Sequence, residues 1–239
     1  MGPVGRWGAA GKLYASHVPL SAFQKAALAV GSAVGALASP ERADLVAALG
    51  ETTGEAALEK TRQRMLSTRE GRAVINHRPR IKESTLLQLE SLPENTFGGM
   101  YWKFMNRRGF SPDERPPVRF VDDEELAYVA TRYREVHDFW HVIFDCPTTI
   151  LGELALKTLE YQQTGLPMCA LSVLGGQMKL SGTNRRILFR HYVPWALQAA
   201  RRSTHLMSIE YEKHFDRDLE ECREAWNVLP CPKRETLVT

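Results

Sequence analysis

One short stretch carries the most information in this sequence: His137-Asp138-Phe139-Trp140-His141. The two histidines are four residues apart, so on a helix they share one face. Asp138 is rotated by about 100° from His137 on a 3.6-residue helix, which lets it reach an ion that the histidines hold. Glu153 follows after eleven intervening residues. Two imidazoles and two carboxylates suit a borderline divalent ion, zinc first.

The residues before the motif predict the start of a helix. Asp122 is expected to be the N-cap, and Glu125 to close a capping box. The acidic run also suits the positive end of the helix dipole. No Pro or Gly then appears before Pro147, and a stripe recurs at helical spacing at Leu126, Ala130, Tyr133, His137 and His141. Such a stripe is typical of a buried face, so both histidines are predicted to point inward.

A second helix is predicted directly after the first. Pro147 suits a first helical position after a corner in the chain. His141 then lies about one turn before the corner and Glu153 about two turns after it, at 1.5 Å per residue. A short connection makes the two helices neighbours, so Glu153 is expected to face His141.

Simpler interpretations of the motif compete with a metal site. A pair of histidines at this spacing arises often by chance, a core histidine is commonly only hydrogen-bonded, and Asp138 and Glu153 could be ordinary ion-pair partners. Two adjacent buried imidazoles without a shared partner would be costly, which favours the metal. A zinc protease of the H-E-x-x-H type is disfavoured, because Asp138 follows the first histidine and no third histidine follows at that spacing.

The bulk composition excludes several classes of protein. The chain has 239 residues, 31 basic and 28 acidic, and a net charge of +3, which is too balanced to indicate nucleic acid binding. None of its four cysteines forms a C-x-x-C pair, so neither a cysteine zinc site nor a redox dithiol is indicated. A reducing compartment is the default expectation.

Helical patterns extend along the chain, and no run of alternating apolar and polar residues indicates a sheet. We predict an all-α fold: a single multi-helix domain with the metal site between two consecutive helices. The domain is expected over residues 21–228, between tails at residues 1–20 and 229–239. Residues 183–200 and 203–227 are each predicted to be helical.

The N-terminal region has two features of its own. The first forty residues contain no Asp or Glu, which resembles an organellar targeting segment, and a disordered tail is the alternative. Residues 22–38 are apolar and small, with Gly31-x-x-x-Gly35 inside, and they are marginal in length for spanning a bilayer. A tightly packed helix is favoured over one that touches a membrane.

Three stretches together identify a family resemblance. They are the motif with Glu153, residues 119–129 (Arg-Phe-Val-Asp-Asp-Glu-Glu-Leu-Ala-Tyr-Val) and residues 163–169 (Gln-Thr-Gly-Leu-Pro-Met-Cys). The chain resembles ubiquinone biosynthesis proteins of the coenzyme Q protein 4 family, with weaker similarity from Leu13 to about Trp226. H-D-x-x-H with an eleven-residue gap to Glu is the hallmark of that family.

The resemblance implies an all-helical zinc protein on the matrix side of the mitochondrial inner membrane, bound peripherally. It implies removal of the C1 carboxyl group, with or without oxidation, from a polyprenylated 4-hydroxybenzoate-type substrate. It also implies partners among the other ubiquinone-biosynthesis proteins, and a homodimer is expected as well. Carried over by position, the Zn²⁺ ligands are His137, Asp138, His141 and Glu153.

With this resemblance, three functions are weighed. In a carboxy-lyase, Asp138 or Glu153 would move the proton, and helix 22–38 is expected to form part of the groove for the prenyl tail. In a non-catalytic organiser of the complex, the metal would be structural, and four protein ligands would favour this role. A metal-dependent phosphohydrolase needs a second His-Asp dyad or a bridging second metal site. Neither is found nearby in the sequence, where Glu160 is the only spare carboxylate on the Glu153 face.

Overall fold

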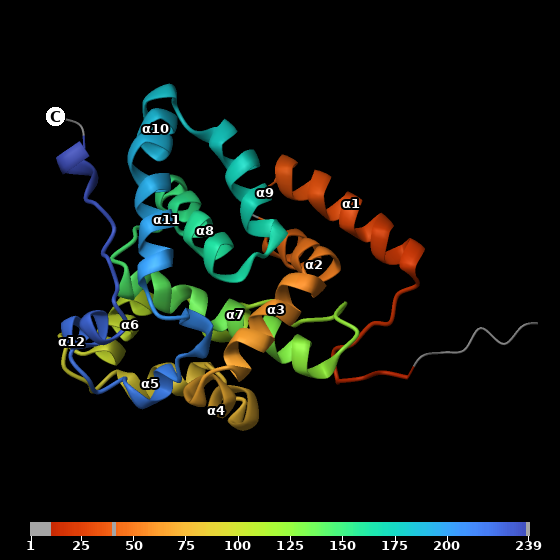
Figure 1. The fold of residues 1–239 in the computed structure, drawn as a ribbon, viewed down its shortest axis with the longest axis horizontal. Coiled ribbons are helices and arrows are strands. Elements are labelled where there is room, and N and C mark those ends of the chain that lie inside the picture. Colours follow the sequence, from red (N-terminus) through yellow and green to blue (C-terminus); the bar gives the residue numbers. More distant parts are fainter. Residues whose placement is uncertain (1–10, 40–41, 238–239) are drawn as a thin grey trace, which may run out of the picture.

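The computed structural model describes residues 11–39 and 42–237, and these fold into α-helices joined by short loops (Figure 1). Within these residues no strand occurs, and the β-type pairing is limited to an isolated bridge between Thr96 and Asp218. The all-α prediction is confirmed. The helices are α1 Ala22–Ala38, α2 Ala43–Thr53, α3 Glu55–Leu66, α4 Arg69–His77, α5 Glu83–Leu89, α6 Phe97–Asn106, α7 Glu124–Ile143, α8 Ile150–Thr164, α9 Pro167–Gly176, α10 Gly182–Ile187, α11 Val193–Arg202 and α12 Leu219–Ala225.

Helix α7 runs through the centre of the molecule and is buried around most of its circumference. Its N-cap is Asp123, whose carboxylate accepts a hydrogen bond from Leu126 N at 2.7 Å. The prediction that Asp122 caps the helix is therefore wrong by one residue. Asp122 instead pairs with Lys25 at 3.1 Å and His17 at 3.0 Å, which ties the N-terminal segment to the start of α7.

Helix α8 starts later than the sequence suggested. Pro147 is not its first residue, because the chain first turns through Asp145 in the left-handed region, at φ 49°. Thr149 then caps the helix by accepting a hydrogen bond from Gly152 N at 3.2 Å. Gly165 ends the helix at φ 72°, because glycine adopts this left-handed conformation without strain.

Helix α1 lies at one edge of the molecule against α2 and α9 (Figure 1). Ser21 and Gln24 form a full capping box at its start. A methyl group at Gly35 would come within 2.7 Å of Leu45, so the small residue lets α1 approach α2 closely. In the parts of the chain that are described, no helix has the length and apolarity needed to cross a membrane.

The C-terminal part departs most from expectation. Residues 203–227 form short turns and helix α12 in place of the predicted long helix. Side chains from α8 and α4 satisfy backbone groups here, since Leu206 N donates to Gln163 Oε1 at 3.1 Å and Glu210 N donates to Glu70 Oε1 at 2.8 Å. These bonds replace the ladder that a helix would have formed.

Candidate metal centre

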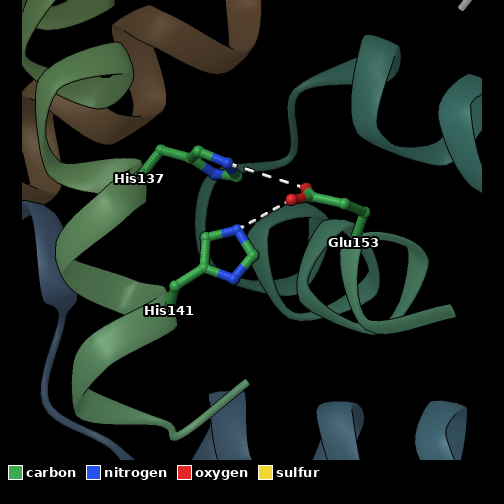
Figure 2. Close-up of side chains that lie close together, drawn as sticks. All are labelled: His137, His141 and Glu153. Atoms are coloured by element: carbon green, nitrogen blue, oxygen red, sulfur yellow. Dashed lines mark ion pairs between the residues drawn. The ribbon is translucent and has the colours of Figure 1, made fainter. Parts of the chain in front are cut away.

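Three side chains of the motif converge between α7 and α8. One ligand atom each from His137, His141 and Glu153 lies within 4.8 Å of the others. Glu153 Oε2 is 3.7 Å from His137 Nε2, and Glu153 Oε1 is 3.0 Å from His141 Nε2. Figure 2 shows the glutamate reaching from α8 toward both rings, which α7 presents one turn apart. The expected convergence across the corner is present for these three residues.

The hydrogen bond on the far side of His141 defines its tautomer. His141 Nδ1 lies 2.9 Å from the carbonyl oxygen of Cys146, which can only accept, so Nδ1 carries the proton. In the neutral ring, Nε2 then presents a lone pair. This Nε2 is buried without a hydrogen-bond partner among the described residues, although Glu153 is near it. The Cys146 carbonyl belongs to the corner between α7 and α8, so the local turn orients the ring.

A buried carboxylate defines the tautomer of His137. Its Nδ1 lies 2.7 Å from Glu160 Oε1, so the Nδ1–H donates to the carboxylate and Nε2 faces Glu153. Burial lowers the pKa of His137, as does the ammonium of Lys157. The carboxylates of Glu160 and Glu153 outweigh both effects, and the net pKa is raised. A proton and a metal ion would therefore compete for this nitrogen.

The donor set fits a divalent metal. In the neutral rings two imidazole lone pairs and a carboxylate face one another, and a cation between them would satisfy all three groups. Burial raises the pKa of Glu153, but the neighbouring His141 and His137 outweigh it and lower the pKa to about 2. Glu153 is thus available as an anionic ligand. Two nitrogens and one oxygen suit zinc, and three protein ligands leave a coordination position open.

Asp138 is not part of this group. Its carboxylate pairs with the guanidinium of Arg115, and both side chains are largely buried. Arg115 comes from the loop before α7, where it also donates to the carbonyl oxygen of Pro112 at 3.1 Å. The structure therefore brings together three of the four predicted ligands and places the fourth beside them, facing a different partner.

The centre opens into a cavity of about 700 Å³. His137, Asp138 and Glu153 lie in its wall, together with Arg115 and Lys157. Much of the remaining lining is apolar, and α1, α2 and α9 contribute a large part of it, including Ala33, Ala36, Leu37, Val46, Leu49 and Leu171. Helix α1 contributes to the wall, as the sequence suggested. The cavity thus joins a charged end at the motif to an apolar end beneath α1.

Sequence reasoning missed the residues that surround the ligands. Glu160 was placed on the same face as Glu153, but its contact with His137 was not foreseen. Lys157 contacts Glu160 at 2.7 Å, one turn before it on α8, a spacing that could have been noticed. Arg115 lies in an irregular loop, and no local pattern indicates where its side chain points.

Comparison with known proteins identifies the family. Residues 14–232 match the family described as Coenzyme Q (ubiquinone) biosynthesis protein Coq4. The mitochondrial ubiquinone biosynthesis protein COQ4 homolog of Bos taurus is 46% identical over 226 residues, covering 94% of this chain and 85% of the relative. The corresponding Homo sapiens protein is 45% identical over 225 residues, covering 93% and 85%.

A solved structure shares the fold. The crystal structure of a protein from Nostoc punctiforme, provisionally assigned to ubiquinone biosynthesis, aligns with a TM-score of 0.68 and 21% identity over 84% of this chain and 97% of that one. The extent of the family match and the identity to the mammalian proteins show that this chain belongs to the Coq4 family of ubiquinone biosynthesis proteins.

Proposed function

We propose that the protein is a zinc-dependent carboxy-lyase that removes the C1 carboxyl group of a polyprenylated 4-hydroxybenzoate-type intermediate. The observation that carries the proposal is the position of the three-donor centre. His137 and Glu153 lie in the wall of a cavity that is charged at one end and apolar over most of its length. An amphiphile with an anionic aromatic head and a prenyl tail has matching chemistry.

The number of ligands supports an enzyme over a structural metal. Structural zinc sites are closed by four protein ligands, whereas catalytic sites keep one position open. Asp138, the fourth candidate, pairs with Arg115 and leaves His137, His141 and Glu153 as the donors. A bound zinc ion would supply Lewis acidity to an oxygen of the substrate.

Two further side chains would bind the substrate and transfer the proton. Arg115 lines the cavity and can hold the substrate carboxylate by a charge-assisted contact. Asp138 pairs with Arg115 in the free protein. When the substrate carboxylate takes that place on the guanidinium, Asp138 can take up a proton from solvent and deliver it to the ipso carbon. The ring gains that proton, the electron pair of the broken carbon–carbon bond returns to the ring, and CO₂ leaves. Proton transfer by Asp138 agrees with its position outside the ligand group.

The surface around α1 supports peripheral binding to a membrane, which we propose to be the mitochondrial inner membrane on its matrix side. Phe23, Val30, Val34 and Leu37 form an exposed stripe along α1, with Phe23 83% exposed. Leu37 also lines the cavity, so the apolar end of the cavity reaches this surface. A prenyl tail could then pass between bilayer and cavity without crossing water, and partner proteins of the pathway would work at the same membrane.

Membrane binding can be tested with vesicles. The double variant Val30→Ser/Val34→Ser should reduce co-flotation with vesicles of anionic phospholipid, because it removes exposed apolar area. Leu87→Ser is a matched control, since Leu87 is 63% exposed on α5, which lies on another part of the molecule. Equal flotation of the wild type, the double variant and Leu87→Ser would contradict the proposal that the exposed stripe of α1 binds the membrane.

The carboxy-lyase activity is tested with purified protein. Zinc-loaded protein, incubated with a prenylated 4-hydroxybenzoate in detergent, should release CO₂, and chelated protein should not. Asp138→Asn should lose most of this activity, because Asn cannot deliver a proton. CO₂ release that is unchanged by both zinc removal and the Asp138 substitution would refute the proposal.

The exposed stripe and the apolar cavity also support the second candidate, a non-catalytic organiser that binds a prenyl lipid and recruits other enzymes. This function predicts binding of the prenylated acid without CO₂ release. It also predicts that ubiquinone output in cells follows assembly of the complex, and that Asp138→Asn leaves that output normal. Pull-down of the complex and measurement of the carboxylated intermediate in the same cells distinguish the two.

A further inference from the structure

We infer that Glu160 is the positioning residue that turns His137 into a metal ligand, because its buried carboxylate fixes the imidazole tautomer whose Nε2 faces His141 and Glu153. This deepens the proposed function and rests on the metal role given there to His137. Glu160 does not line the cavity, so it acts through the histidine and not on the substrate.

The contacts of Glu160 divide between its two oxygens. Oε1 accepts the hydrogen bond from His137 Nδ1 at 2.7 Å. Oε2 accepts from Lys157 Nζ at 2.7 Å and from the hydroxyl group of Tyr133. The side chain is fully buried, and a buried carboxylate persists only when it is paired and hydrogen-bonded. Lys157 supplies that charge, and the charged Glu160 in turn has no proton to donate to His137.

This arrangement leaves His137 a single neutral tautomer. A carboxylate can only accept, so Nδ1 must carry the proton and Nε2 must carry the lone pair. An acidic acceptor also makes the opposite nitrogen a stronger ligand, as in the carboxylate–histidine pairs behind many zinc sites. His141 reaches the same tautomer through the backbone carbonyl of Cys146. Of the two rings, His137 is therefore the one whose orientation depends on a side chain.

Glu160→Gln provides a sharp test, because an amide has one acceptor end and one donor end. The ammonium of Lys157 and the hydroxyl of Tyr133 both donate to Glu160 Oε2, so the amide oxygen should turn toward them. The amide NH₂ would then face His137 Nδ1, which must become an acceptor. The proton moves to Nε2, where it blocks the metal position.

Two measurements report this change. Imidazole nitrogen shifts from NMR of the metal-free protein at alkaline pH should show His137 as the Nδ1–H tautomer in the wild type and as the Nε2–H tautomer in Glu160→Gln. Zinc affinity, measured by competition with a chromophoric chelator, should fall by about 10–100-fold. Tyr133→Phe is the matched control: it removes one donor to Oε2 but leaves the Oε1 contact, so tautomer and affinity should stay close to the wild type.

A second variant tests the role of Lys157. In Glu160→Gln/Lys157→Met the ammonium is gone, so the amide oxygen can return to His137 Nδ1–H while the NH₂ donates to the hydroxyl of Tyr133. Tautomer and zinc affinity should both shift back toward the wild type. This variant also leaves no unpaired buried charge, so it should fold if the single variant does not.

The inference is overturned if Glu160→Gln keeps the Nδ1–H tautomer and wild-type zinc affinity. It is also overturned if the double variant binds zinc no better than the single one. Failure of the proposed function looks different. If wild-type protein shows the Nδ1–H tautomer and binds zinc but releases no CO₂, then the positioning role stands and the carboxy-lyase does not.

Discussion

Two buried histidines, His141 and His205, share one unusual feature but differ in the groups that surround it. His141 and His205 each have an Nε2 atom that is buried without a hydrogen-bond partner. Nε2 of His141 faces Glu153 and lies beside His137, next to an open cavity. Burial, with the charge of Arg64 adding to it, lowers the pKa of His205 to about 3. An unpaired imidazole nitrogen therefore indicates a metal ligand only where other donors converge on the same point.

The largest expected effect is a loss of zinc affinity when His141, but not His205, is replaced. His141→Ala should lower zinc affinity by on the order of 100-fold or more, because it removes one of three donors. His205→Ala should leave zinc affinity at the wild-type level. Zinc content by mass spectrometry and helicity by circular dichroism check both proteins. Equal zinc loss in the two variants would mean that His141 acts through stability alone.

The next largest effect is the pH dependence of stability that His205 causes. The pKa of His205 is lowered from about 6.5 to about 3, so below pH 6.5 the unfolded chain takes up a proton that the native protein does not. Stability is therefore lost as pH falls through this window. At pH 5 the loss from this group is about 2 kcal/mol.

His205→Gln removes the titration and its pH dependence. Urea unfolding at pH 7 and pH 5 should show that the variant loses less stability between the two values than the wild type, by about 2 kcal/mol. Because other groups titrate equally in both proteins, the difference isolates His205. An identical pH slope in the two proteins would contradict the burial argument.

A smaller effect is expected from the cap that holds Glu153 in place. Thr149 accepts a hydrogen bond from Gly152 N at the start of α8, and Glu153 lies in the first turn. Thr149→Ala should lower the free energy of unfolding by about 1 kcal/mol. Thr158→Ala on the same helix is the control, since its hydroxyl only donates back to Leu154 O within the helix. Thermal unfolding of the two variants gives the comparison.

The smallest effect is expected at Asp138. Asp138→Asn should leave zinc affinity close to the wild-type value, because Asp138 faces Arg115 and not the three converging donors. Glu153→Gln, measured beside it, should lose zinc strongly. If Asp138→Asn loses as much zinc as Glu153→Gln, then Asp138 leaves Arg115 and joins the ligands when the ion binds.

Much of the centre was predictable because it depends on local rules. An acidic cap followed by twenty residues without Pro or Gly predicts helix α7, and helical periodicity then places His137 and His141 on one face. The short corner makes α8 a neighbour of α7, so Glu153 could be expected opposite them. The start of α8 was misplaced, because the left-handed turn at Asp145 delays the helix to Ile150.

The sequence alone is sufficient to predict the all-α class, the two helices that carry the motif, and the family. The tertiary structure decided the partner of each motif side chain. Asp138 could have joined the three converging donors or paired with a cation distant in the sequence, and its pairing with Arg115 depends on how a loop with no periodic pattern packs against α7. Glu160 likewise becomes a partner of His137 only because α8 is buried against α7. Backbone periodicity is local and can be read along the chain, whereas the choice among polar partners is made by packing between residues far apart in the sequence.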